Sequence, residues 1–64
     1  MFYIIRDENK NKIFSDNNFN RLNNFMQYNG IDYIIKEIVK INYDDTIIEF
    51  KNGYSLCMLE FDYS

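Results

Sequence analysis

The chain has 64 residues, nearly half of them apolar, and its ten Asp and Glu outweigh its seven Lys and Arg to give a net charge of −3. This length predicts one domain, and the single cysteine together with the lack of His excludes an internal disulfide and a structural zinc site. An acidic chain is a poor candidate for binding nucleic acid, because most of that affinity comes from neutralised phosphates.

The N-terminal third predicts a hairpin followed by a helix. Residues 2–6 and 12–14 are β-rich runs around a uniformly polar turn at 7–11. Ser15 or Asp16 is a suitable N-cap, and Asn29-Gly30 suits a helix C-terminus. Between them, four apolar residues share one face of a helix predicted over about 16–28: Phe19, Leu22, Phe25 and Met26.

The middle segment, residues 31–43, fits two patterns. One set of residues has helical spacing: Ile31, Ile34, Ile35, Ile38 and Val39. Another set alternates as in a strand, with Glu37 as the exception: Ile35, Val39, Ile41 and Tyr43. Isoleucine, valine and tyrosine favour strands, and the next segment needs a partner. We therefore predict a strand over about 33–43, with a helix over 31–39 as the alternative.

The C-terminal third predicts a second hairpin. Two β-rich runs, 46–50 and 54–61, flank Lys51-Asn52-Gly53, and Asn-Gly is typical of a two-residue turn. Asp44-Asp45 can turn the preceding strand into Thr46. The predicted fold is a small α+β domain of order β-β-α-β-β-β, an antiparallel sheet with one helix packed on one face.

A two-residue turn at Asn52-Gly53 fixes which residues share a face of the sheet. It pairs Phe50 with Ser55, Ile48 with Cys57 and Thr46 with Leu59, and this face is the expected core. The opposite face then carries Ile47, Glu49, Tyr54, Leu56 and Met58. One helix covers one face only, so either the first hairpin or another chain covers these residues. The alternative, which the sequence leaves open, is that loops and strand twist hide them.

The same register gathers acidic residues at one end of the sheet. Asp44 and Asp45 lie in one turn, and Glu60 and Asp62 come from the neighbouring strand. We expect all four to be exposed, as a solvated tip or as a contact for a basic partner, including a nucleic-acid-binding protein. A cation site is the third alternative, although the pattern of a calcium loop is absent.

The chain lacks the motifs of the common catalytic devices. Without His there is no Ser/His/Asp or Cys/His arrangement, and Gly30 and Gly53 do not form a phosphate loop. We expect no enzyme activity, no cofactor and no metal. Cys57 is expected to point inward beside Ile48 as a small apolar residue.

Composition also bears on origin and compartment. The chain has no Ala, Pro, Trp or His but is rich in Ile, Asn, Lys, Tyr and Phe, as in proteins from AT-rich genes. The lone cysteine and the lack of a signal peptide or an apolar run of membrane length predict a cytoplasmic protein, in the host cell if the gene is viral. In size, acidity and composition the chain resembles the short proteins with which phages and mobile elements block host defences, anti-CRISPR proteins among them.

Three hypotheses on function follow. The first is a protein-binding inhibitor or adaptor, with a possible homodimer, acting through the apolar face or the acidic end. The second is a nucleotide or oligonucleotide binder that uses sheet aromatics with five basic residues: Arg6, Lys10, Lys12, Arg21 and Lys36. The third is a structural or assembly subunit.

Overall fold

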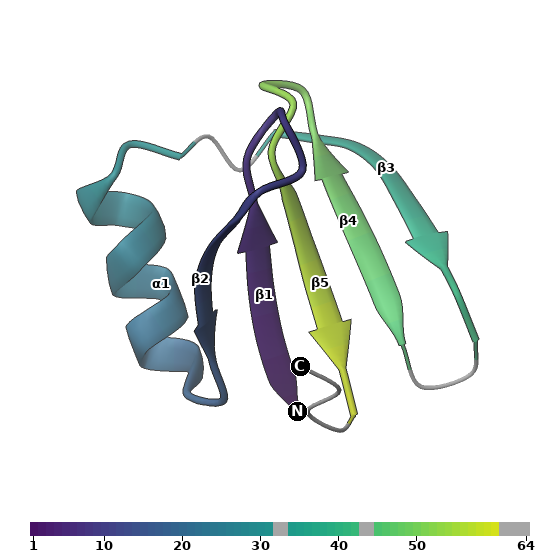
Figure 1. The fold of residues 1–64 in the computed structure, drawn as a ribbon, viewed down its shortest axis with the longest axis horizontal. Coiled ribbons are helices and arrows are strands. Elements are labelled where there is room, and N and C mark those ends of the chain that lie inside the picture. Colours follow the sequence, from purple (N-terminus) through teal and green to yellow (C-terminus); the bar gives the residue numbers. More distant parts are fainter. Residues whose placement is uncertain (32–33, 43–44, 61–64) are drawn as a thin grey trace.

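The computed structural model describes residues 1–31, 34–42 and 45–60. Its elements are β1 (Phe2–Arg6), β2 (Lys12–Asp16), α1 (Phe19–Tyr28), β3 (Ile35–Lys40), β4 (Thr46–Phe50) and β5 (Ser55–Leu59). The strands form one antiparallel sheet in the order β2-β1-β5-β4-β3, and α1 lies at its β2 side (Figure 1). The predicted α+β class and element order are confirmed. No helix in the described ranges is long and apolar enough to cross a membrane.

The helix begins later than predicted. Asp16 still belongs to β2, and its carboxylate accepts the backbone N–H of Asn18 at 2.9 Å. Asn18 is the N-cap, and its side-chain oxygen accepts the N–H of Arg21 at 3.1 Å. Neither Ser15 nor Asp16 caps the helix directly, because the second strand continues two residues beyond Phe14.

The helix ends as the sequence predicts. Gly30 has φ +65, and its N–H donates to the carbonyl of Gln27, while the N–H of Ile31 donates to that of Met26. These two bonds form a Schellman motif, which places an apolar residue after the glycine against the last turn of the helix. Ile31 and Met26 are accordingly both buried in the main apolar cluster.

The second hairpin has a three-residue loop, so the predicted register is wrong by one residue. The N–H of Phe50 donates to the carbonyl of Tyr54, and the N–H of Gly53 donates to that of Phe50. Gly53 has φ +92, but Lys10 is the only described non-glycine residue with positive φ, so Asn52 does not adopt the conformation of a two-residue type I′ turn.

This slip reverses the faces of β5 relative to β4. Ile48 pairs with Leu56, and Ile47 pairs with Cys57. Because a one-residue shift moves every side chain of a strand to the other face, the expected core face of the sheet does not exist as predicted. Cys57 points away from Ile48 and lies between Ile4 and Ile47 on the opposite face. Its thiol is half-buried, and desolvation by burial raises its pKa.

The core lies between α1 and the nearer strands. Ile5 and Met26 are almost fully buried, with Leu22, Phe50 and Leu56 beside them. Aromatic pairs tie the helix to the first hairpin: Phe14 stacks on Phe25 at 4.6 Å between centroids, and Tyr3 meets Phe19 edge to face at 6.1 Å. The helix therefore packs closest to β2 and β1, and its buried residues reach as far as Leu56 and Phe50.

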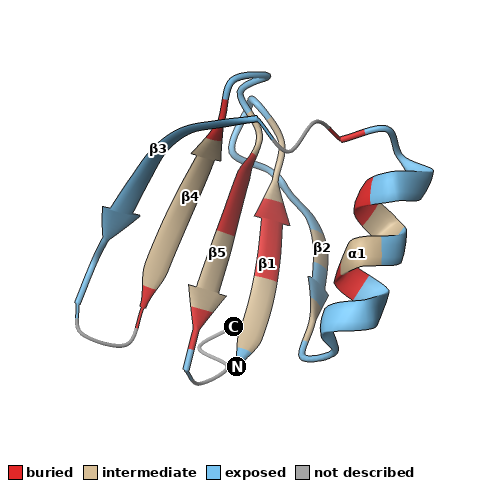
Figure 2. Cartoon of the chain, turned by 180° about the vertical axis from the view of Figure 1, so that it is seen from behind, coloured by how far each residue is buried: buried red, intermediate tan, exposed pale blue. Residues whose placement is uncertain are grey.

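The middle segment is a strand, as predicted, but a shorter and more exposed one. β3 pairs only with β4, and it is exposed along its whole length, whereas β1 and β5 carry buried residues (Figure 2). A bulge between Ile35 and Glu37 interrupts its ladder. The outer parts of the expected 33–43 strand, residues 33 and 43, lie outside the described residues.

Candidate functional site

A row of apolar side chains crosses the helix-side face of the sheet and defines the candidate site. The directly opposed pairs are Ile5 with Leu56, Leu56 with Ile48, and Ile48 with Ile38, and opposed residues of antiparallel strands share a face. Exposure rises along this row from 0 % at Ile5 to 56 % at Ile38. The face is apolar from end to end, but α1 covers only part of it.

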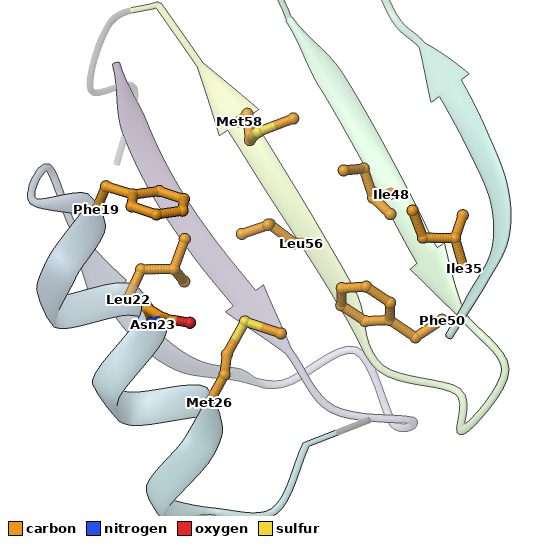
Figure 3. A pocket seen from close by; sticks show the side chains of 9 residues that line it. All are labelled: Phe19, Leu22, Asn23, Met26, Ile35, Ile48, Phe50, Leu56 and Met58. Carbon is orange, nitrogen blue, oxygen red and sulfur yellow. The ribbon is translucent and has the colours of Figure 1, made fainter. Parts of the chain in front are cut away.

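The uncovered part forms an apolar groove of about 320 Å³ between α1 and the outer strands (Figure 3). Its helix wall carries Phe19, Leu22, Asn23 and Met26, and its sheet side carries Ile35, Ile48, Phe50, Leu56 and Met58. Figure 3 shows these side chains converging from the two sides, with Asn23 as the single polar member. We name this feature the groove.

The groove exists because one helix is too narrow for a five-stranded sheet. Strands lie about 4.8 Å apart, so roughly 19 Å separate the axes of β2 and β3. A helix with its side chains is about 10 Å wide, and it therefore covers about two strands. The stripe on α1 that was expected to cover the core face leaves the outermost strand, β3, exposed along its whole length.

The predicted apolar site is divided between the two faces. Tyr54, Leu56 and Met58 lie on the helix side, where Leu56 and Met58 line the groove and Leu56 is buried. Ile47 and Glu49 lie on the opposite face. The surplus apolar surface was expected on the face away from the helix. The groove lies on the helix side instead, where β4 contributes Ile48 and Phe50 in place of Ile47 and Glu49.

The predicted acidic site is also altered. Asp45 is only 5 % exposed, and its carboxylate accepts the side-chain amide of Asn42 at 2.9 Å and the N–H of Glu60 at 3.2 Å. The expectation that Asp45 is solvated is therefore wrong, because it holds the turn before β4 against the end of β5. Glu60 is exposed and lies beside this turn. Asp44 and Asp62 lie outside the described residues.

The basic residues considered for nucleic acid fall into separate places. Arg6, Lys10 and Lys12 gather at the first hairpin, where the Arg6 guanidinium donates to the carbonyl of Lys10 and Arg6 pairs with Lys12. Arg21 lies on the helix and contacts Asp16 at 3.4 Å, and Lys36 lies on the far edge of the sheet. No group of three potential metal ligands occurs within the described part of the chain.

Sequence reasoning missed the role of Ile35 and Ile38. Both belonged to the ambiguous segment, and their helical spacing concealed that they flank a bulge and return to the same face, Ile35 opposite Phe50 and Ile38 opposite Ile48. Comparison with protein-family models, curated proteins and solved structures finds no match for this chain.

Proposed function

We propose that this protein acts by binding another protein through the groove, as a small inhibitor or adaptor without catalytic activity. The observation that carries the proposal is the row from Ile5 to Ile38, an apolar face that leaves its outer side chains in water. Burying such side chains is worth roughly 25 cal/mol per Å², which favours a partner over solvent. Exposed apolar surface next to a hollow is typical of interaction sites.

The biological setting is the second part of the proposal. The AT-rich composition and the resemblance to anti-defence proteins of phages favour a host protein as the partner, such as a component of a defence complex, in the cytoplasm of the host cell. The acidic end is a weaker candidate for the contact than the groove, since the Asp45 carboxylate is already occupied by Asn42 and Glu60.

The chain offers a matched pair of positions that tests this proposal. Ile38 and Val39 are neighbours on β3 and are both exposed, at 56 % and 38 %, but they lie on opposite faces. A photo-crosslinking phenylalanine analogue at position 38, but not at 39, is expected to form an adduct with a host protein. Ile35→Glu, which places a charge in the groove, should abolish that adduct.

Other results of the crosslinking experiment would reject the groove. Equal adducts at 38 and 39, an adduct only at 39, or an adduct that survives Ile35→Glu would each assign recognition elsewhere. Circular dichroism of each variant checks that it is folded, and Val39→Glu is the control for placing a charge on the edge strand.

The homodimer stays a prediction, but the single apolar face from which it was inferred does not exist as expected. It rested on the lack of a disulfide or metal in so small a domain and on one surplus apolar face. The residues expected on that face lie on two faces: Ile47, Glu49, Tyr54, Leu56 and Met58. Sedimentation equilibrium at micromolar concentration measures it directly.

The oligonucleotide binder is kept as the second candidate, on the grouping of Arg6, Lys10 and Lys12 at one hairpin. Fluorescence anisotropy with a labelled single-stranded oligonucleotide tests it, and a salt-sensitive signal that disappears in Lys10→Glu/Lys12→Glu would promote it. We expect no binding to duplex DNA at physiological salt, because the net charge is −3.

A further inference from the structure

We infer that the outer edge of β3 pairs with the same edge of a second copy of the chain, antiparallel and centred on Val39. This inference gives the homodimer a defined surface, and it does not depend on the partner proposed for the groove. Three features of β3 carry it: apolar side chains exposed on both of its faces, backbone groups that point to its open edge, and a charge pattern that selects one register.

Apolar exposure is concentrated on β3 and the residues beside it. More than half of the large apolar side chains that are exposed among the described residues come from residues 34–41: Ile34, Ile35, Ile38, Val39 and Ile41. The other edge strand differs, because β2 contributes only Ile13 to this group and its Phe14 stacks on Phe25 of α1. The sheet thus has one edge that its own helix protects and one edge that it leaves open.

The exposed side chains of β3 lie on both faces of the sheet. Ile38 opposes Ile48 on the helix side, and Val39 opposes Ile47 on the other face. An occupant of the groove covers the helix side alone and leaves Val39 in water. A strand that runs alongside β3 contacts both faces, because its own side chains alternate between them.

The backbone of β3 also presents hydrogen-bonding groups at its outer edge. The N–H of Ile41 donates to the carbonyl of Asp45, just before β4. Backbone groups of successive residues in a strand point to opposite sides, so those of Val39 also point to β4, and those of Ile38 and Lys40 point away from it. No described strand lies on that side, since β3 is the last strand of the sheet. A second strand there would exchange hydrogen bonds with both residues.

The edge carries some protection against pairing with arbitrary strands. A bulge lies between Ile35 and Glu37, and Lys36 and Lys40 are both exposed. Bulges and lysines are usual means of blunting a sheet edge. The bulge lies at one end of β3, however, and the ladder to β4 is regular from Glu37 to Lys40. This regular stretch is the part that is available for pairing.

The charges select one way of pairing two such stretches. A two-fold axis at Glu37 or at Lys40 sets that residue against its own copy, and an axis at Ile38 sets Lys36 against Lys40. Like charges directly opposite each other destabilise a sheet. An axis at Val39 is the one position within the regular stretch that opposes no like charges. The lysines therefore specify the register and do not prevent pairing altogether.

This register has a consequence for the groove. Ile38 of each copy forms a hydrogen-bonded pair with Lys40 of the other, and the two Val39 residues form a non-hydrogen-bonded pair with about 4.5 Å between their Cα atoms. The two sheets become one. The two-fold axis is perpendicular to this sheet and keeps both helices on the same face. The two grooves then merge into one apolar floor with a copy of α1 on either side.

A disulfide scan tests the register. Cys57→Ala removes the natural cysteine, and Val39→Cys in this background should form a covalent dimer in a glutathione buffer, because about 4.5 Å suits a disulfide. Ile38→Cys and Lys40→Cys should stay monomeric, since each lies roughly 8 Å from its own copy, beyond the limit of about 7 Å. In urea all three variants should react alike, which controls for the reactivity of the thiols.

Proline at the edge separates strand pairing from stacking of the two far faces, which would also bring two Val39 residues together. Ile38→Pro removes an N–H that points to the open edge and spares the ladder with β4. In sedimentation equilibrium it should weaken self-association at least roughly tenfold relative to Ile38→Thr, which keeps this N–H. Circular dichroism checks that both variants are folded, and the disulfide scan decides alone if Ile38→Pro is not.

Several results would overturn the inference. Covalent dimers that form faster at position 38 or 40 than at 39, or equally fast at all three in the folded protein, would reject the register. Self-association that Ile38→Pro leaves unchanged would reject pairing at the edge. A wild-type chain that sediments as a monomer up to about 100 μM would reject the dimer itself. Each of these results leaves the groove proposal standing, because crosslinking to a host protein from position 38 tests that proposal separately.

Discussion

The two halves of the helix-side face have similar apolar side chains but very different surroundings. On the inner half, Ile5 is enclosed by Leu22 and Met26 of α1, whereas on the outer half Ile38 faces water. The sheet continues to β3, where a bulge interrupts the ladder, but α1 does not reach that strand. Exposure of an apolar residue here reflects how far one helix reaches across the sheet. The inner half supplies buried core residues, and the outer half leaves apolar side chains exposed.

The largest expected effect comes from removing volume on the inner half. Ile5→Ala should lower the free energy of unfolding by about 2–5 kcal/mol, because Ile5 is 0 % exposed and the cavity cannot collapse easily. Ile38→Ala should change it by no more than about 0.5 kcal/mol. Urea unfolding followed by circular dichroism measures both. Since small domains are marginally stable, Ile5→Val, expected to cost about 0.5–1.5 kcal/mol, keeps the comparison measurable. Equal losses of unfolding free energy at positions 5 and 38 would contradict the difference between the inner and outer halves.

The outer half is held in place by a turn, and Asp45 is its anchor. Asp45→Ala removes both side-chain contacts, to Asn42 and to the N–H of Glu60, and should cost about 1–3 kcal/mol of unfolding free energy. Asp45→Asn keeps an oxygen that can accept from Glu60, so its loss should be smaller. A pair of variants as stable as the wild type would mean that this buried carboxylate does not tether β4 to β5.

The helix on the inner half depends on its C-terminal glycine. Gly30 has φ +65 and open space around the position of a Cβ, so Gly30→Ala tests conformation without a clash. We expect a loss of about 1 kcal/mol in unfolding free energy, because a residue with a Cβ disfavours this left-handed conformation. Thermal unfolding measures this loss. Gly30→Asn should lose less unfolding free energy than Gly30→Ala, because Asn tolerates positive φ better. A larger loss for Gly30→Asn would show that the left-handed conformation of the Schellman motif is not the cause.

The smallest expected effect is a gain on the outer half. Glu37 and Glu49 lie directly opposite each other on β3 and β4, and like charges in this position destabilise a sheet. Glu49→Gln should therefore raise the unfolding free energy by about 0.2–1 kcal/mol in low salt. The gain should shrink in 1 M NaCl, where charges are screened beyond roughly 3 Å. A gain that persists in high salt would point to a cause other than repulsion.

Local patterns were sufficient to predict the fold, but they did not determine the faces of the sheet. The alternating runs, the stripe on α1 and the Asn29-Gly30 stop each depend on neighbouring residues, and the order of elements followed from them. The register of the second hairpin depends on whether Asn52 adopts positive φ, which no pattern in the sequence decides. A single residue in the loop then moved Tyr54, Leu56 and Met58 to the helix side.

The burial of Asp45 has a weak signal in the sequence. Asn and Asp often bond to the backbone of their own turn, and Asn42 precedes Asp45 at the spacing that such a turn needs. The extent of the groove had no local signal at all. It depends on where α1 sits across the sheet, and the sequence of the helix does not encode that position by itself.

The account is tested most directly by the solvent exposure of isoleucine methyl groups in the protein without a partner. In a sample with ¹³C-labelled isoleucine δ1-methyls, a small soluble paramagnetic agent broadens only the methyl signals that it can approach. We expect strong broadening for Ile35 and Ile38, intermediate broadening for Ile48, and none for Ile5, following their exposure in the structure. Protection of Ile35, Ile38 and Ile48 equal to that of Ile5 would show that the outer half is already covered, and would contradict an open groove.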